Sequence, residues 1–405
     1  MRILHTADWH LGKHLGPYER TGEHALFLQW LLDQINRQSI DVLIIAGDVF
    51  DTGNPSNTAL KQYYDFLWQV KNTCCRDVVI VGGNHDSVST LHAPRDLLRF
   101  FNVHVVGGVP ENFDEQVIEI KDDSGTTQLI VCAVPFLRDR DIRLSVPGES
   151  ADERRQRISR GIAEHYRHLV PYIVPYRERH IPIVATGHLF TAGAQASPDS
   201  EKDIHVGNLG QVAGDQFPAE FDYMALGHLH RPQLVNGMPH IRYSGSPIPL
   251  SFSENSDQKV VLAASFADGK LFEAKEIPVP ASRRLIRVKG DWEKVKVKLS
   301  LIESQAGELP AWIEIQVEID DYMDDLDEQL KAMEFVNSEI VFVKQIRTRQ
   351  HQSMSETVEE ALSLNDLHPL AVFEKRCAQE EVETGYDDLL QTFHEALELM
   401  EDRKS

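Results

Sequence analysis

Short apolar runs, each followed abruptly by Gly, Asp, Asn or His, constrain the fold of this chain more than any other feature. They are too short for helices and mostly apolar on both faces, which favours buried central strands. Between them, Glu23 to Arg37 and Thr58 to Lys71 show helical spacing of Leu, Phe, Trp and Tyr, as expected for helices packed on a core. The chain is therefore predicted to form an α/β core whose strands are Arg2 to His5, Val42 to Ala46, Val78 to Val81, Leu129 to Val134, Ile181 to Ala185 and Tyr223 to Leu226.

Length and composition exclude several classes of protein. A chain of 405 residues with 42% hydrophobic residues can bury a large core and is expected to carry more than one domain. It contains neither an apolar run near the roughly 18 to 20 residues that span a bilayer nor a signal-peptide pattern, so we expect a cytoplasmic protein without a membrane partner. Four cysteines without a Cys-x-x-Cys motif argue against a disulfide framework and a thiolate zinc site.

The formal net charge of −22 has the wrong sign for a protein that binds nucleic acid by neutralising phosphates. The charge is unevenly distributed, however. Residues 351 to 405 contain 14 acidic and 4 basic residues, a local balance of −10. Almost half of the acidic excess therefore lies in the C-terminal tail, which is suited to a protein partner rather than to DNA.

A change of pattern near Pro278 divides the chain into a first domain, residues 1–277, and a smaller one, residues 278–347. The second reads as strand, helix, strand, helix, strand, and Trp312 to Ile319 alternates apolar and polar residues, as expected for one buried and one solvated face. Residues 348–365 read as a polar linker, and residues 366–405 as a helical segment.

One helical face of the tail is apolar. It is formed by Leu389, Phe393, Leu397 and Met400. Amphipathicity alone does not decide whether this stripe docks on a partner or folds back on its own chain.

Five of the apolar runs end in clusters of residues that can bind metal. Strand ends at one sheet edge converge, and costly polar groups gathered there make sense if cations compensate them. Imidazole, carboxylate and amide ligands without thiolate suit Mn, Fe or Zn, and the groups gathered in these clusters exceed the needs of one ion, so two metals are implied. The clusters are Asp8-Trp9-His10, Gly47-Asp48-Val49-Phe50-Asp51, Gly83-Asn84-His85-Asp86, Gly187-His188 and Gly227-His228-Leu229-His230.

This order of motifs resembles the calcineurin-like metallophosphoesterases. The resemblance implies a four-layer β-sandwich flanked by helices, with a small α/β capping domain and a helical tail. It also implies the roles of the site residues: Asp8, His10 and His230 as ligands of one metal; Asn84, His188 and His228 as ligands of the other; Asp48 as the bridge; His85 as general acid; and Asp51 as the carboxylate that orients His85. Asp86 is expected to cap the turn or the following helix instead.

The segments HTADWHLG, AGDVFDTGNPS, GGNHDS, PFLRDRDI, ALGHLHRPQ and YSGSPIPLSFSE further resemble the SbcD family of nucleases, which act on DNA double-strand ends. The match runs from Ile3 to about Glu254, while the later parts agree only in pattern. Members of the wider family often have His where this chain has Asp51, which weakens the transfer of that role.

The resemblance implies partners and a cofactor. The chain has no Gly-x-x-x-x-Gly-Lys-Ser/Thr loop, so ATP dependence must come from another chain, in this family an SbcC-type coiled-coil ATPase. The expected substrates are double-stranded DNA ends and hairpins, in DNA repair, replication and recombination. Two Mn²⁺ ions are the expected cofactors, and a homodimer is expected through helices near the second and third motifs.

Two other functions remain open at this point: hydrolysis of small phosphoesters, because the metals do not determine the ester, and a scaffold that has lost the chemistry. Basic residues at Arg138, Arg140, Arg143 and from Arg154 to Arg160 are interleaved with acids and read as a solvated helix face. The segment SGSPIPLSF is the better candidate for substrate contact, since its Ser hydroxyls and main-chain N–H groups could approach phosphates.

Overall fold

The computed structural model describes residues 1–142, 150–194, 212–302, 308–319, 323–333 and 337–347. The chain divides into two compact units, Met1–Ile346 and Arg347–Ser405. The predicted linker, 348–365, and the predicted helical tail, 366–405, lie outside the described residues. The boundaries proposed from the sequence therefore stay a prediction.

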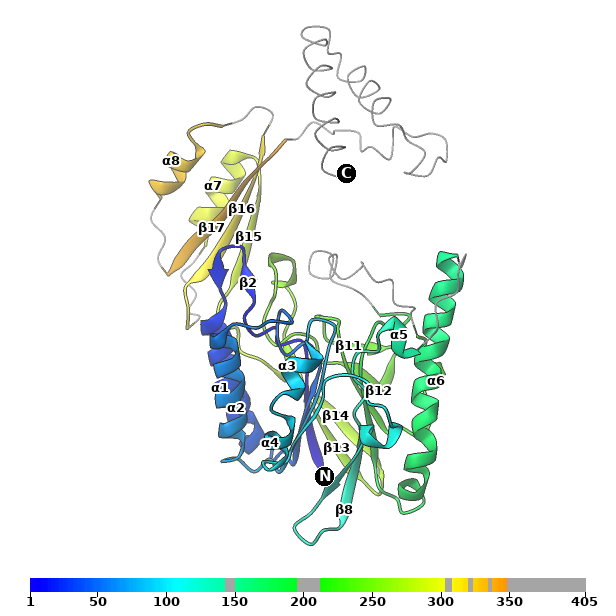
Figure 1. Ribbon diagram of the computed structural model, residues 1–405. Coiled ribbons are helices and arrows are strands. Elements are labelled where there is room, and N and C mark those ends of the chain that lie inside the picture. The colour runs from blue at the N-terminus through cyan, green and yellow to red at the C-terminus, as the bar shows by residue number, and fades with distance from the viewer. Residues whose placement is uncertain (143–149, 195–211, 303–307, 320–322, 334–336, 348–405) are drawn as a thin grey trace, which may run out of the picture. The chain divides into compact units, whose positions relative to one another are not determined.

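Two six-stranded sheets form the centre of the first unit (Figure 1). The first has the order β14 (Lys270–Pro278), β13 (Val260–Ala267), β1 (Arg2–Thr6), β4 (Val42–Ala46), β5 (Asp77–Val81) and β6 (Val103–Val106). The second has the order β11 (Gln233–Val235), β12 (Met238–Tyr243), β10 (Tyr223–Gly227), β9 (Ile183–His188), β8 (Thr127–Cys132) and β7 (Val117–Lys121). Strands β1, β4, β5 and β6 are parallel, as are β12, β10, β9 and β8, whereas the other strands pair antiparallel at the edges.

The alternation of side chains along each strand builds four layers. In β4, Val42 and Ile44 face the second sheet, where they join a core with Val131 and Val184. The intervening residues face the helices α1 (Thr21–Arg37) and α2 (Asn57–Val70), and the outer face of the second sheet packs against α6 (Ala151–Arg177). The remaining short helices are α3 (Val88–His92), α4 (Arg95–Arg99), α5 (Asp139–Ile142), η1 (Phe113–Gln116), η3 (Gly214–Gln216) and η4 (Phe252–Glu254).

A smaller three-stranded sheet follows, with a core of its own. Its elements are β15 (Leu285–Gly290), α7 (Trp292–Ser300), β16 (Ala311–Ile319), α8 (Leu326–Lys331) and β17 (Ser338–Arg347), in the predicted order. The prediction of a solvated face on β16 is wrong at Glu314, which is only 2% exposed. Because β16 is the central strand, Arg287 and Lys344 on its neighbours cover this carboxylate with ion pairs.

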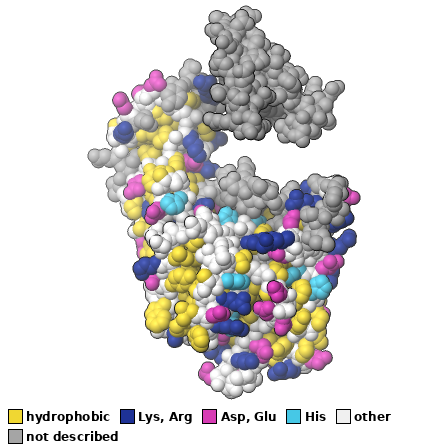
Figure 2. All heavy atoms as spheres, in the orientation of Figure 1, with side chains coloured by type: hydrophobic (Ala, Val, Ile, Leu, Met, Phe, Trp, Pro, Cys, Tyr) yellow, Lys and Arg dark blue, Asp and Glu magenta, His cyan; other side chains and the backbone are white. Residues whose placement is uncertain are grey.

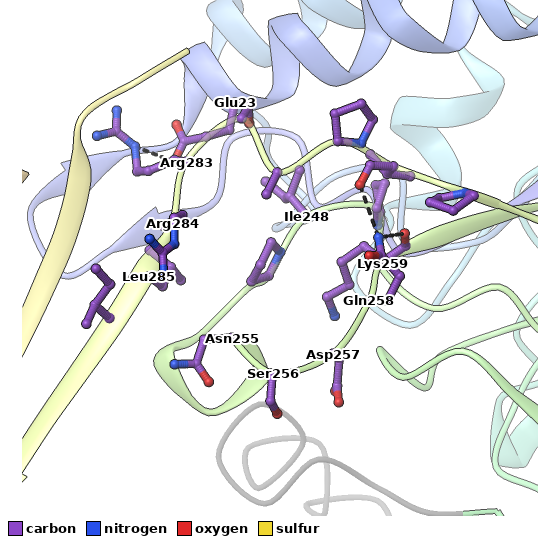
Figure 3. Close-up of a pocket in the computed structure, with 18 of the residues that line it drawn as sticks. Glu23, Ile248, Asn255, Ser256, Asp257, Gln258, Lys259, Arg283, Arg284 and Leu285 are labelled. Carbon is purple, nitrogen blue, oxygen red and sulfur yellow. Dashed lines mark hydrogen bonds and ion pairs between the residues drawn. The ribbon is translucent and has the colours of Figure 1, made fainter. Parts of the chain in front are cut away.

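A short hairpin of β2 (His14–Leu15) and β3 (Tyr18–Glu19) joins the first sheet's loops to the small sheet. Tyr18 packs against the Trp312 ring, with 5.4 Å between centroids. Next to it, the buried Glu23 accepts hydrogen bonds from Arg20 and Arg283, and the Glu23–Arg283 pair lines a pocket of about 640 Å³ (Figure 3). The small three-stranded sheet thus contacts the rest of the first unit through an aromatic contact and a buried cluster of ion pairs.

The predicted fold class is confirmed, and the strands and helices predicted in the first domain are all present. Their ends differ from the predictions by a few residues: the strand expected at Ile181 to Ala185, for example, is β9. Within the described ranges, none of the helices is long and apolar enough to cross a membrane.

Candidate metal centre

Five loops, each following a parallel strand, converge at one edge of the two sheets. Asp8 and His10 follow β1, and the loops after β4 and β5 carry the next candidates, while β9 and β10 contribute from the second sheet. The loops are hydrogen-bonded to one another: the Asp8 N–H donates to Gly47 O at 3.0 Å, and the His228 N–H donates to the Asp8 carboxylate at 2.8 Å. The main chain therefore holds residues from both sheets in fixed positions.

Four of the candidate residues have an unusual backbone conformation. Asp8, His10, Asp48 and His228 have φ values of +53°, +48°, +49° and +99°. Non-glycine residues rarely adopt positive φ, and such strain concentrates at functional sites, where the surrounding structure maintains it.

Two motif glycines are required because other parts of the site approach them closely. A Cβ on Gly83 would lie 2.1 Å from Asp48 Oδ1, and one on Gly47 would lie 2.2 Å from His188 Nδ1. Any side chain at either position would displace a candidate ligand.

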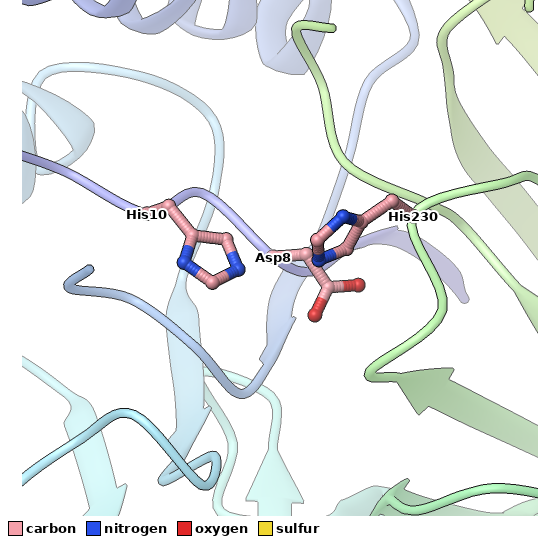
Figure 4. Close-up of side chains that lie close together, drawn as sticks. All are labelled: Asp8, His10 and His230. Atoms are coloured by element: carbon pink, nitrogen blue, oxygen red, sulfur yellow. The ribbon is translucent and has the colours of Figure 1, made fainter. Parts of the chain in front are cut away.

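Asp8, His10 and His230 form one group of possible ligands (Figure 4). One ligand atom of each lies within 4.8 Å of those of the other two, and all three residues are buried. The His10 and His230 rings meet edge to face, with 5.2 Å between centroids. The first predicted set is thus brought together.

Asn84, His188 and His228 form the second group. Asn84 Oδ1 lies 3.0 Å from His188 Nε2 and 3.1 Å from His228 Nδ1. The other ring nitrogen of His188 donates to Ala46 O at 2.9 Å, which directs Nε2 into the site.

Asp48 lies between the two groups. Its Oδ2 is 3.6 Å from His10 Nε2 and 3.2 Å from His188 Nε2. Its Oδ1 accepts the main-chain N–H of His85 at 2.9 Å, which fixes the carboxylate.

The site contains buried polar atoms whose burial a bound cation would compensate. Among the described residues, Asp8 Oδ2 and His10 Nε2 are buried and have no hydrogen-bond partner. Buried polar atoms of this kind are costly unless something compensates them. Oxygen and imidazole nitrogen are ligands that Mn, Fe and Zn accept, so the residues present fit divalent metal ions.

Burial and neighbouring charges also shift the pKa values of the side chains in this cluster. Burial, together with the negative charge of Asp48, raises the pKa of Asp8 to about 7, although His188 and His230 oppose this. Burial also opposes charge on His188, but the carboxylates of Asp48 and Asp8 outweigh it and raise the pKa to about 9. For Asp48, burial is overcome by the same His188, and the pKa is lowered. Burial lowers the pKa of His228 to about 3, so its ring is neutral and available as a ligand.

His85 and Asp51 lie at the more open side of the cluster. Burial opposes ionisation of Asp51, but contacts to His10 at 3.2 Å and to Lys13 at 3.1 Å lower its pKa to about 2. His85 Nδ1 donates a hydrogen bond to the main-chain carbonyl of Asp51, at 2.8 Å. The orienting contact seen here is therefore not the carboxylate expected from the resemblance and does not depend on the side chain at position 51.

Asp86 has the structural role that was expected, in a different form. Its carboxylate accepts from the N–H groups of Gly83, Val49 and Phe50, which ties its own turn to the loop after β4. The cap of α3 is the neighbouring Ser87, whose side chain accepts from Thr90 N–H.

Two serines of the segment expected to contact substrate use their hydroxyls within the protein, and substrate contact by the rest of the segment stays a prediction. Ser244 and Ser246 are fully buried, and their hydroxyls donate to main-chain carbonyls within the segment. Sequence reasoning missed Glu254 at its end, which contacts His230 Nδ1 at 3.2 Å. Only the position of this glutamate shortly after the last ligand motif could have indicated such a contact.

The basic residues after β8 agree with a solvated helix face. Arg154 and Arg155 are about half exposed and pair with Asp139 and Asp152. Arg143 lies outside the described residues.

Comparison with known proteins identifies the family to which this fold belongs. Residues 1–232 match the family model of the calcineurin-like phosphoesterases, and residues 281–381 match that of the type 5 capsule protein repressor C-terminal domain. A crystal structure of a dimetal phosphatase from Danio rerio aligns with 69% of this chain and 99% of its own, with a TM-score of 0.40 and 12% identity. The family model covers more than half of the chain, so the chain is a calcineurin-like phosphoesterase.

Curated relatives narrow the class. The chain is 37% identical over 393 residues to the SbcD subunit of the SbcCD nuclease of Escherichia coli K12, covering 96% of each chain. It is 35% identical to the protein of the same name from Rhodobacter capsulatus over 71% of each chain, and 32% identical to that of Bacillus subtilis over 80% of each. The chain therefore belongs to the SbcD family of calcineurin-like phosphoesterases.

Proposed function

We propose that this chain is a metal-dependent DNA nuclease that hydrolyses phosphodiesters as the nuclease subunit of an SbcCD-type complex. One observation carries the proposal. Seven side chains of the types that bind metal ions, contributed by both sheets, lie close together, and some of their buried oxygen and nitrogen atoms have no hydrogen-bond partner. Relatives named as the SbcD subunit of the SbcCD nuclease cover nearly the whole chain, which supports DNA over small phosphoesters as the substrate.

The proposed ligands follow the two groups. Asp8, His10 and His230 would hold one ion, and Asn84, His188 and His228 the other. Asp48 would bridge them, in agreement with its position between His10 and His188. Ions held by these residues would supply positive charge to stabilise the phosphoryl group and would lower the pKa of a water molecule that attacks it. Mn²⁺ is the proposed metal, one of the ions that this mixed oxygen and nitrogen set accepts.

His85 is the proposed general acid. Its Nδ1 donates to Asp51 O, so the opposite nitrogen, Nε2, is the one available to a substrate. A proton donated from there to the leaving oxygen would avoid release of an alkoxide. Asp51 supports the ring through its main chain, and its carboxylate holds His10 and Lys13.

The proposed partner is an SbcC-type coiled-coil ATPase, which the acidic tail and its apolar stripe would bind. Relatives named as part of the SbcCD nuclease support this choice. A cytoplasmic location remains a prediction from the sequence.

A homodimer is the proposed oligomeric state. Exposed apolar side chains lie on or directly after α2 and α4, which follow the second and third motifs. They are Tyr64 and Trp68 on α2, Leu97 on α4, and Phe100 just after α4, which is 84% exposed. Figure 2 shows hydrophobic side chains gathered over this part of the surface. An apolar surface of this kind is a candidate for self-association.

The proposal is tested with the purified chain, alone and with its ATPase partner, on end-labelled duplex and hairpin DNA in Mn, Mg or Zn. Metal-dependent cutting of DNA, stimulated by the partner and ATP, is expected. Faster turnover of a small phosphomonoester than of DNA would favour the small-phosphoester function, and no turnover of any ester in any metal would favour a scaffold.

A further inference from the structure

Glu254 connects the candidate metal centre to the segment that follows it. It lies in the short helix η4 and is fully buried, and its Oε1 lies 3.2 Å from His230 Nδ1. With Nδ1 facing this carboxylate, the nitrogen on the opposite side of the ring, Nε2, is the one directed at Asp8 and His10 (Figure 4).

The other carboxylate oxygen of Glu254 is held by two N–H donors and a neighbouring hydroxyl. Oε2 accepts from Lys259 Nζ at 2.6 Å and from Leu250 N–H at 3.2 Å, and Ser246 Oγ lies 3.2 Å away. The side chain therefore has little freedom to rotate away from His230.

Lys259 and Ser246 also bind the main chain of His230. Lys259 Nζ, which is only 4% exposed, donates to His230 O at 2.9 Å, and the Ser246 N–H donates to the same oxygen at 3.1 Å (Figure 3 shows Lys259). His230 is thus fixed at both its ring and its carbonyl by one closed cluster of buried polar groups.

We propose that Glu254 is a positioning residue for the metal centre, in which it fixes the ring orientation of His230 while Lys259 anchors both residues. This inference rests on the proposed metal-dependent function. A carboxylate behind an imidazole ligand selects the ring tautomer and strengthens the ligand, and its loss commonly costs 10- to 100-fold in metal affinity.

A purely structural role would be satisfied by any well-paired buried glutamate, and the chain provides one for comparison. Glu23 is also buried, 1% exposed, and is paired with Arg20 and Arg283, but it contacts none of the proposed metal ligands. The two glutamates share burial and ion pairing and differ in the contact with His230.

The experiment measures Mn²⁺ binding by calorimetric titration and the melting temperature of the metal-free chain for wild type, Glu254→Gln and Glu23→Gln. Each substitution leaves a buried cation under-compensated, so both should lower the melting temperature. Glu254→Gln should also weaken one of the two Mn²⁺ sites by about 10- to 100-fold. Glu23→Gln should bind Mn²⁺ like the wild type.

A double variant, Glu254→Gln with Lys259→Met, removes the buried charge imbalance and provides the test if the single variant does not fold. It should recover the melting temperature but keep the weakened site. Wild-type Mn²⁺ affinity in the Glu254 variants, or equal weakening in Glu23→Gln, would overturn the positioning role. Failure of the wild type to bind two Mn²⁺ ions or to cut DNA would instead reject the proposed function.

Discussion

Replacing His85 with Gln tests the proposed chemistry with little disturbance of the metal ligands. The His85 N–H that fixes Asp48 belongs to the main chain, at 2.9 Å from Oδ1, and is present whatever the side chain. The lost contact is the one from ring Nδ1 to Asp51 O. We therefore expect His85→Gln to bind both metal ions and DNA while lacking a proton donor.

The expected loss follows from that single missing group. A positioned general acid contributes about 100-fold or more to the rate. Because each tenfold change corresponds to about 1.36 kcal/mol in the barrier, the transition state should lose about 2.7 kcal/mol. Loss of a metal ligand would be much more severe, since the nucleophile and the clamp would be lost together.

The assay compares two substrates that differ in their leaving group. On DNA, His85→Gln should be slowed by about 100-fold or more, because the departing alkoxide needs a proton. On a bis-nitrophenyl phosphodiester the leaving oxygen is already stable as an anion, so most of the activity should remain. Elemental analysis of bound Mn provides the control. An equal loss on both substrates at full metal content would assign His85 a different role.

Three further outcomes are expected. Asp48→Asn and His228→Ala should each abolish hydrolysis and lower the Mn content measured by elemental analysis, and near-normal activity with depleted metal would remove the two-metal mechanism. Trp68→Glu should convert a dimer into a monomer in light scattering, whereas Leu234→Glu, an exposed apolar residue on β11, should leave it unchanged; a persistent Trp68→Glu dimer would reject the proposed interface. Deletion from Ser363 onward should preserve metal-dependent cutting but remove ATPase binding in calorimetry, while a joint fall in melting temperature and activity would mean that the stripe packs on its own chain.

The sequence predicted the parts of the site that depend on local pattern. Strand β4, for example, is apolar on both faces and is followed directly by Gly47, so both its burial and the position of Asp48 at the sheet edge could be inferred. The helices α1 and α2 followed from apolar spacing in the same way. Strand ends at a common edge converge whatever the details of packing, which is why the convergence of the five clusters could be predicted, whereas the division of the ligands into two sets came from the family resemblance.

Contacts between residues distant in sequence could not be predicted in this way. Nothing in the local pattern shows that the Asp51 carboxylate contacts His10 while the Asp51 main-chain carbonyl accepts a hydrogen bond from His85. These contacts depend on how two loops cross. Glu314 is a similar case: alternation predicts a solvated face, but Lys344, thirty residues later, covers the carboxylate. Tertiary packing decides which side chains from different elements contact one another. Hydrophobic periods of 2 or 3.6 residues indicate strands and helices but do not predict these contacts.

The arrangement of the site connects metal binding to the packing of the two sheets. Asp8, His10 and Asp48 come from loops of the first sheet, whereas His228 and His230 come from the second. Neither sheet alone holds a complete set, so the site exists only when the layers are packed face to face. Ions bound there would stabilise only the state in which the sheets are packed together. Free metal at 100 times its dissociation constant would add about 2.7 kcal/mol to the free energy of unfolding. The same metals that would drive hydrolysis would therefore also oppose separation of the sheets, and they would offset the cost of the strained φ values and of the buried Asp8 oxygen at the shared edge.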